Sequence, residues 1–187
     1  METTCLNEPV LAARALTEPE AFALLYDAYF PRIYNYIRFR VQDPHLTDDL
    51  TSQVFERLLK KISYFQPGRG SFAAWLFAIA HNVVVDHYRA EQRQRWAVVA
   101  VAAESNSIAP DPLEALIDRQ RRQDVLQALA ALTGREREVI ALKFSAGLTN
   151  REIAKLTGFS ASHIGVMLFR ALKQLKKRLE QEAGHHE

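Results

Sequence analysis

Apolar residues recur at helical spacing along most of the chain. The first series returns every three or four positions and comprises Phe22, Leu25, Tyr29, Ile33 and Ile37. This spacing places the side chains on one face of a helix. Thr17, Glu18, Pro19 and Glu20 together are typical of a capping box that begins this helix, with a proline in its first turn. Pro31 interrupts the pattern and predicts a kink or a break.

Two more helices are predicted before residue 96. One begins near Thr47, with Asp48 and Asp49 in its first turn, where carboxylates favour the positive end of the helix dipole. Residues 65–70 contain Pro and two Gly, which is typical of a loop. Ser71 is then expected to cap a long helix reaching about residue 95. Its predicted buried face contains Phe72, Leu76, Ile79 and Val83.

The helical pattern fails between residues 97 and 112, where the side chains are small and weakly polar. Beyond it, Asp111 and Pro112 are expected to begin a helix, and capping boxes start at Thr133 and Thr149. Ser160 is expected to cap the last helix. We therefore predict an all-α protein of two small helical domains, residues 1–96 and 113–187, joined by a flexible linker over residues 97–112.

Residues 150–170 carry the strongest local signal in the second domain. Two predicted helices meet at Gly158, in a short turn typical of a helix-turn-helix. The outward side of the second helix is predicted to contain Ser160, Ala161, Ser162, His163, Val166 and Arg170. A DNA-binding unit inserts the start of that helix into the major groove. An ordinary helical corner is the alternative, and the basic residues that follow along the same helix favour DNA.

Composition and charge narrow the class of protein. The chain has 187 residues, a formal net charge of +2 and one cysteine, Cys5. A single cysteine excludes an internal disulfide framework. No stretch approaches the ~20 apolar residues of a membrane helix, and no signal peptide is recognisable at the N-terminus. We therefore expect a cytoplasmic protein without membrane insertion. The basic excess lies after residue 112.

A second candidate nucleic-acid surface lies in the first domain. Aromatic residues gather around the predicted loop, namely Tyr64, Phe65, Phe72 and Trp75, and Asn82, Arg89 and Arg93 follow on the long helix. Proteins that bind single-stranded nucleic acid combine aromatic rings, which stack on the bases, with cationic side chains along the phosphate backbone. Burial in the core is the ordinary alternative for Phe72 and Trp75. His81, Asp86 and His87 are a much weaker metal candidate, because their spacing does not share one helical face.

Three motifs in this order resemble the extracytoplasmic-function (ECF) group of bacterial sigma factors. The run from Phe72 through Trp75 and Asn82 to Arg89 resembles the promoter-melting segment of that group. Asp49-Leu50 with Val54-Phe55 resembles its core-polymerase-binding helix. Glu152-Ile153-Ala154, Ser160 and Leu168-x-Arg170-Ala171 resemble its promoter-reading helix-turn-helix. The resemblance covers nearly all of residues 20–180.

The resemblance implies three functional surfaces and no catalytic, metal or cofactor site. The surface expected to bind core RNA polymerase comprises Asp48, Asp49, Leu50, Gln53 and Phe55. The residues expected near the melted non-template strand of the −10 element are Tyr64, Phe65, Phe72, Asn82, Asp86, Arg89 and Arg93. Those expected at the −35 duplex are Ser160, Ser162, His163, Val166, Arg170 and Lys173.

Two departures from the family pattern concern these surfaces. Ser52 and Gln53 stand where the family often has Gln-Glu, and residues 162–167 replace the usual Gly-Thr-Val-Lys-Ser-Arg of the reading helix, which removes two cations.

The resemblance also implies an anti-sigma partner and a free protein that is monomeric. The alternative function is a stand-alone helix-turn-helix regulator, which would form a dimer and bind duplex DNA without polymerase.

Overall fold

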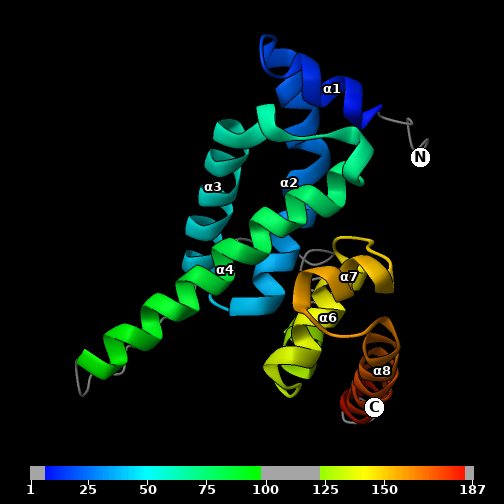
Figure 1. Cartoon of the computed structure of the whole chain (residues 1–187). Helices are drawn as coiled ribbons and strands as arrows, with labels where there is room; N and C mark the ends of the chain where they lie inside the picture. The colour runs from blue at the N-terminus through cyan, green and yellow to red at the C-terminus, as the bar shows by residue number, and fades with distance from the viewer. Residues whose placement is uncertain (1–6, 98–122, 184–187) are drawn as a thin grey trace.

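A computed structural model describes residues 7–97 and 123–183, and all of the regular structure in these two ranges is helical (Figure 1). The predicted all-α fold is therefore confirmed. The predicted linker, together with the helix start expected at Asp111 and Pro112, lies outside the described residues apart from Ala97. Within the described ranges, no helix combines the length and apolar character needed to cross a membrane.

The first module, residues 7–97, is built around α2, α3 and α4, with α1 packed on α2. Its helices are α1 (Glu8–Arg14), α2 (Pro19–Val41), α3 (Pro44–Lys61), the short 3₁₀ turns η1 (Ile62–Tyr64) and η2 (Pro67–Arg69), and α4 (Phe72–Ala97). The Ser71 hydroxyl accepts a hydrogen bond from the amide of Ala74, as expected of the residue that caps α4.

Helix α2 passes through Pro31 without a break. Pro31 is exposed, while Tyr29, Ile33 and Ile37 of the same helix are buried. Burial of these side chains offsets the lost backbone hydrogen bond, so the break that the sequence allowed does not occur. The predicted capping box at Thr17 is also wrong, because Glu18 is the N-cap and makes no side-chain capping bond.

Helix α3 begins three residues earlier than the sequence pattern indicated. The Asp43 side chain accepts a hydrogen bond from the amide of Leu46 at 2.9 Å, and Pro44 occupies the first turn. An Asp cap followed by Pro is a strong start signal. Asp48 and Asp49 consequently lie beyond the first turn, and the prediction that they favour the helix dipole there is wrong.

The second module, residues 123–183, matches its predicted helix boundaries closely. Residues 123–130 are helical and are followed by α6 (Gly134–Phe144), α7 (Asn150–Thr157) and α8 (Ala161–Ala183). Both predicted capping boxes, at Thr133 and Thr149, are present. Gly158 ends α7 with a φ of 77°, a conformation that glycine adopts without strain. The Ser160 hydroxyl accepts from the amide of His163.

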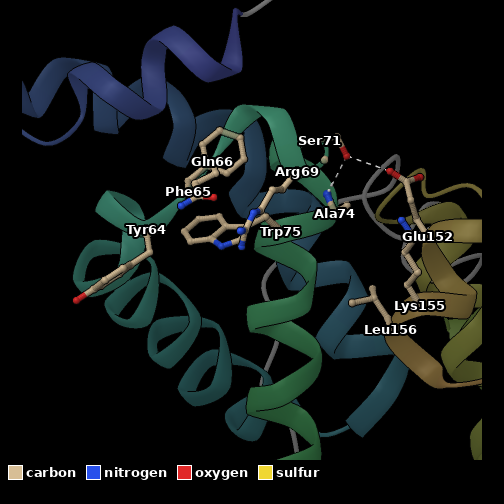
Figure 2. A pocket seen from close by; sticks show the side chains of 11 residues that line it. Tyr64, Phe65, Gln66, Arg69, Ser71, Ala74, Trp75, Glu152, Lys155 and Leu156 are labelled. Atoms are coloured by element: carbon tan, nitrogen blue, oxygen red, sulfur yellow. Dashed lines mark hydrogen bonds between the residues drawn. The ribbon is translucent and has the colours of Figure 1, made fainter.

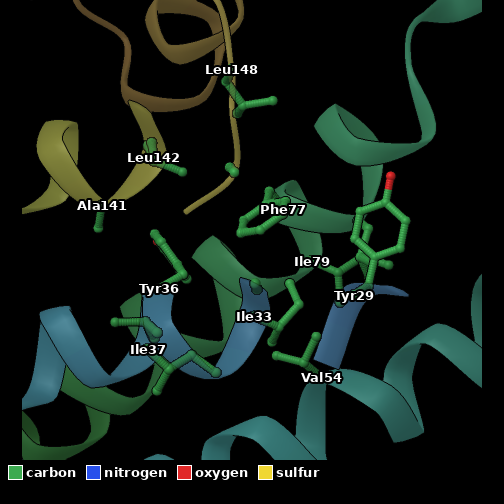
Figure 3. Packing of buried hydrophobic residues seen from close by; sticks show 14 of the residues in the cluster. Tyr29, Ile33, Tyr36, Ile37, Val54, Phe77, Ile79, Ala141, Leu142 and Leu148 are labelled. Atoms are coloured by element: carbon green, nitrogen blue, oxygen red, sulfur yellow. The ribbon is translucent and has the colours of Figure 1, made fainter. Parts of the chain in front are cut away.

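The two modules share one hydrophobic core. Figure 3 shows Tyr36 of α2 and Phe77 of α4 facing Leu142 of α6 and Leu148 of the loop that follows it. All four of these side chains are buried. The modules are therefore packed together in this structure, and apolar burial supplies a substantial part of what holds them.

Arginines of α2 add hydrogen bonds across the same interface. Arg32 donates to the backbone carbonyls of Ser145 at 3.2 Å and Ala146 at 2.6 Å, which lie just past the end of α6. Arg40 donates to the carbonyl of Gly134 at 2.7 Å, at the beginning of α6. The two guanidinium groups thus hold both ends of α6 against α2.

Gln42 forms a third polar link between the modules. Its amide donates to the carbonyl of Leu126 at 3.0 Å, and its side-chain oxygen accepts from Arg137 at 3.1 Å. Gln42 has a φ of 61° at the end of α2, a left-handed conformation that is uncommon for residues other than glycine. The backbone at this position is strained in order to end α2, and the hydrogen bonds to the second module stabilise it.

Candidate nucleic-acid interface

The exposed side of α3 is polar and acidic. Asp48, Asp49 and Gln53 are all exposed, together with Ser52 and Glu56. These residues repeat at spacings of three and four, so they share one helix face. The hydrogen bond from the Ser52 hydroxyl to the carbonyl of Asp48 is local. The face is therefore available to a partner.

Leu50 and Phe55, which were expected on the same surface, lie in the core instead. Leu50 is 2% exposed and Phe55 is 5% exposed. Phe55 packs against the rings of Tyr26 and Phe30 on α2. Both side chains are buried within the module, and Phe55, seven residues from Asp48, lies along the edge of the exposed face.

An aromatic cavity lies between the loop before α4 and helix α7. It has a volume of about 570 Å³ and contains Tyr64, Phe65 and Trp75 of the first module (Figure 2). Phe65 packs edge-on against Phe72 and is tilted against Trp75, with centroid distances of 5.2 and 5.4 Å. Rings arranged in this way around an open space can accept a flat base by stacking.

The aromatic residues of this region differ in exposure. Tyr64 is 74% exposed, whereas Phe65 and Trp75 are half-buried. Phe72 is buried at the centre of the cluster, where it also contacts Tyr29. The expectation that Phe72 contacts nucleic acid is thus not met by its placement. Phe72 supports Phe65 from behind, and Tyr64 is the ring most open to solvent.

A polar stripe continues from this cavity along α4. Asn82, Asp86, Arg89 and Arg93 are all exposed and are spaced by four, three and four residues. Trp75 precedes Asn82 by seven residues, two turns of helix, and therefore lies on the same face at a rise of about 10.5 Å. One helix face thus carries a ring, an amide and two cations in order.

Asp86 has a partner within the protein. Its carboxylate lies 3.0 Å from the guanidinium of Arg57 on α3. The pair is partly exposed, so it contributes little to stability. The pair does neutralise a carboxylate that would otherwise repel a phosphate. The remaining charge of the stripe is therefore positive and comes from Arg89 and Arg93.

The helix-turn-helix presents its predicted residues outward. Ser160, Ser162, His163, Arg170 and Lys173 are exposed. Val166 is also exposed, while Ile153, Ile164 and Met167 are buried. Phe169, which is not among the residues predicted at the −35 duplex, is also exposed on α8. Its spacing of three from Val166 and seven from Ser162 was a usable signal.

The second module also lines the aromatic cavity. Glu152, Lys155 and Leu156 of α7 form its far side (Figure 2). The Ser71 hydroxyl donates to Glu152 at 3.1 Å while it caps α4. Hydrogen bonds from the backbone and hydroxyl of Thr149, with a smaller one from Ser71, hold the pKa of Glu152 below its usual value despite partial burial. The helical repeat of the sequence does not predict this contact between Ser71 and Glu152.

His81 lies at the interface between the two modules. Its Nδ1 atom lies 2.9 Å from the carboxylate of Glu138 on α6, and Arg40 lies 3.6 Å from the same oxygen. Burial raises the pKa of Glu138, but the partner His81 and the charges of Arg40 and Arg135 outweigh it and lower the pKa overall. No group of three or more metal-ligating side chains occurs in the part of the chain that the structure describes.

Two family models match the chain. Sigma-70 region 2 matches residues 25–94, and sigma-70 region 4 matches residues 122–175. The first range includes most of α2, all of α3, the aromatic loop and most of α4. The second range includes α6, α7 and the first part of α8. Each matched range therefore contains one or more of the surfaces described above.

Curated relatives and solved structures agree with these matches. The chain is 32% identical to the ECF RNA polymerase sigma factor SigX of Bacillus subtilis, over 86% of this chain and 84% of SigX. It is 30% identical to the ECF RNA polymerase sigma factor BldN of Streptomyces coelicolor, over 89% of this chain and 63% of BldN. The chain thus spans less than two thirds of BldN.

The fold is also that of solved sigma-factor structures. The structure of the sigma factor RpoE in complex with the anti-sigma factor NepR from Bartonella quintana matches 85% of this chain and 96% of that chain, with a TM-score of 0.70 and 23% identity. CnrH in complex with the cytosolic domain of CnrY matches 93% and 97%, with a TM-score of 0.65 and 24% identity. On the two family models and the SigX relation, the chain belongs to the ECF group of the sigma-70 family.

Proposed function

We propose that this protein is a dissociable, non-enzymatic specificity subunit of bacterial RNA polymerase that acts in the cytoplasm. In this role the exposed face of α3 docks on core polymerase through Asp48, Asp49 and Gln53. The cavity and the stripe on α4 capture the melted −10 strand, and the exposed side of α8 reads the −35 duplex. The polar and charged residues of these surfaces are exposed, while Phe65 and Trp75 are partly buried against the hydrophobic core.

The observation that carries this proposal is the continuous face of α4. A cavity bordered by Phe65 and Trp75 is followed on the same helix face by Asn82 and then by two arginines. Melting DNA costs unstacking and unpairing energy of a few kcal/mol per extruded base. Stacking on a ring returns about 1–3 kcal/mol per base, and the arginines follow the backbone. The order of these groups suits a single strand that enters at the cavity.

We infer that the packed arrangement of the modules is an inactive state of the protein, distinct from the state that binds a DNA strand. Glu152, Lys155 and Leu156 border the cavity only while α7 lies beside α4. Because this arrangement places the Glu152 carboxylate beside the cavity, we expect capture of a strand there to be favoured when α7 moves away. We propose that an anti-sigma partner holds the free protein in the packed arrangement; the sigma factor RpoE of Bartonella quintana, whose fold this chain shares, was solved in complex with the anti-sigma factor NepR.

The role of Asn82 is tested by separating polymerase docking from transcription. The full chain and its Asn82→Ala variant are assembled with bacterial core RNA polymerase and supplied with a promoter library randomised across the −35 and −10 positions. The wild type is expected to co-elute with polymerase and to yield specific transcripts. Asn82→Ala is expected to co-elute equally well but to lose transcripts roughly ten-fold, the effect of one missing base contact of about 1.4 kcal/mol.

A second pair of variants tests the docking face. Asp49→Lys reverses a charge on the exposed side of α3 and is expected to abolish co-elution, whereas Asp27→Lys makes the same change on the exposed side of α2 and is expected to leave it intact. Binding of duplex DNA by a stable dimer without polymerase, with no co-elution of the wild type, would instead identify a stand-alone regulator.

A further inference from the structure

The exposed side of α8 contains a stripe with an apolar centre. Ser162, Val166, Phe169 and Lys173 are spaced by four, three and four residues, so they lie in a line along the helix. Val166 is 45% exposed and Phe169 is 70% exposed. The buried side of the same helix contains Ile164 and Met167. Val166 and Phe169 are therefore outside the core.

The residues on either side of these two side chains are those of a DNA-facing helix. Ser162 and His163 precede them near the start of α8, and Arg170 and Lys173 follow them, all exposed. A helix that enters the major groove contacts bases with its first turns and phosphates with the cations around them. Charge complementarity thus favours DNA as the occupant of this stripe.

We propose that Val166 and Phe169 read thymine through its C5-methyl group in the −35 duplex. The inference rests on the proposed function, and it names which base the reading helix prefers. The methyl of thymine is the one apolar group on the major-groove edge, and apolar side chains recognise it by contact. A helix without cations at these positions discriminates bases by methyl contact in place of bidentate hydrogen bonds to guanine.

The spacing of the two side chains suits neighbouring base pairs. Three residues of helix advance about 4.5 Å, and successive base pairs are separated by about 3.4 Å. Val166 and Phe169 can therefore contact methyl groups on adjacent pairs. Burying one methyl changes binding about four-fold, so two contacts correspond to roughly fifteen-fold discrimination against a base that lacks the methyl.

Uracil provides a direct test, because it differs from thymine in the missing methyl and keeps the same hydrogen-bonding groups. The full chain, assembled with bacterial core RNA polymerase, is used to select duplexes from a library randomised across the −35 position. The selected duplexes are then made with deoxyuridine in place of thymine at that position. We expect thymine to be enriched and the uracil duplexes to bind about four-fold to fifteen-fold more weakly.

Variants assign the discrimination to the stripe. Phe169→Ala and Val166→Ala are each expected to reduce the thymine-to-uracil ratio about four-fold while retaining phosphate-dependent binding. Leu172→Ala is the matched control, because Leu172 is 43% exposed on the same helix but lies off the stripe. Its ratio is expected to equal that of the wild type. Helicity measured for each variant establishes that α8 is intact.

Two results would overturn the inference in distinguishable ways. Tight, sequence-specific binding of thymine and uracil duplexes with equal affinity would leave the proposed function standing and refute methyl recognition. If Phe169→Ala then weakened association with polymerase, the stripe would be a protein-docking surface. A holoenzyme that selects no duplex at all would refute the −35 role of α8, and methyl recognition with it.

Discussion

Two glycines of the helix-turn-helix have opposite backbone requirements. Gly158 ends α7 in the left-handed region, at a φ of 77°, whereas Gly165 lies within α8, where a side chain is tolerated. A Cβ atom at Gly165 would lie 3.7 Å from the side-chain nitrogen Nδ2 of Asn150, an ordinary contact. Only the first position thus needs a glycine.

Gly165→Ala is expected to stabilise the protein by about 0.5–1 kcal/mol, because glycine in a helix interior costs conformational entropy. Thermal unfolding should show a midpoint raised by roughly 1–4 °C. Gly158→Ala is the paired substitution and should lower stability by about 1–2 kcal/mol through left-handed strain. Equal signs for the two variants would contradict the assigned backbone conformations.

At the scale of helices, side-chain caps define where the elements of the second module begin. Thr149 accepts a hydrogen bond from the amide of Glu152 at 3.3 Å, and the Glu152 carboxylate accepts from the amide of Thr149 at 2.8 Å. This reciprocal arrangement satisfies two backbone donors that α7 would otherwise leave unpaired. Since α7 has only eight residues, its cap is a large part of its local stability.

Thr149→Ala is expected to cost about 1 kcal/mol, the usual effect of removing an N-cap hydroxyl. Denaturant unfolding followed by circular dichroism measures this loss. Thr17→Ala is a suitable comparison, since Thr17 precedes a helix but does not cap it, and it should change stability by less than about 0.5 kcal/mol. A similar loss in both variants would argue against the specific role of the capping box.

The same caps show how far helices can be predicted from sequence. The boxes at Thr133 and Thr149 are local signals of four residues, and both are present. The α2 and α3 starts were misplaced because Pro19 and the Asp43-Pro44 pair set them, and these signals compete with other plausible caps nearby. The continuity of α2 through Pro31 is not predictable locally, because burial on the other side of α2 is a tertiary effect that no local pattern contains.

At the scale of the whole molecule, the helical repeat of the sequence cannot predict which residues of the two modules contact each other. The partner of His81 is Glu138, which is 57 positions away in the chain, on another helix. The outward faces of α3, α4 and α8 were predictable, because exposure follows the helical repeat. The buried placement of Leu50, Phe55 and Phe72 was equally available from that repeat, and the family motif outweighed it in the selection of site residues.

The interface should respond to acid through Glu138. Its pKa is lowered in the folded protein, so the carboxylate stabilises the structure above the ordinary value of 4.5, and this stabilisation is lost as pH falls through the lowered pKa. Glu138→Gln should therefore weaken the packed arrangement near neutral pH and flatten the decline in stability below about pH 4.5. Thermal unfolding across pH measures both effects.

Glu56→Gln is the control for that experiment, because Glu56 is an exposed carboxylate of α3 away from the interface. It should reproduce the acid dependence of the wild type. Small-angle X-ray scattering at neutral pH adds a second measurement, in which Glu138→Gln should increase the radius of gyration if the modules separate. An unchanged acid profile in Glu138→Gln would mean that this carboxylate does not hold the modules together.

The shared hydrophobic core also makes the two modules a thermally sensitive pair. Separation would transfer side chains such as Tyr36, Phe77 and Leu142 to water, and hydration of apolar surface carries a large positive heat capacity. Because of this heat capacity, the hydrophobic attraction between the modules weakens on cooling. A larger fraction of molecules is therefore expected to have separated modules at low temperature than at high temperature.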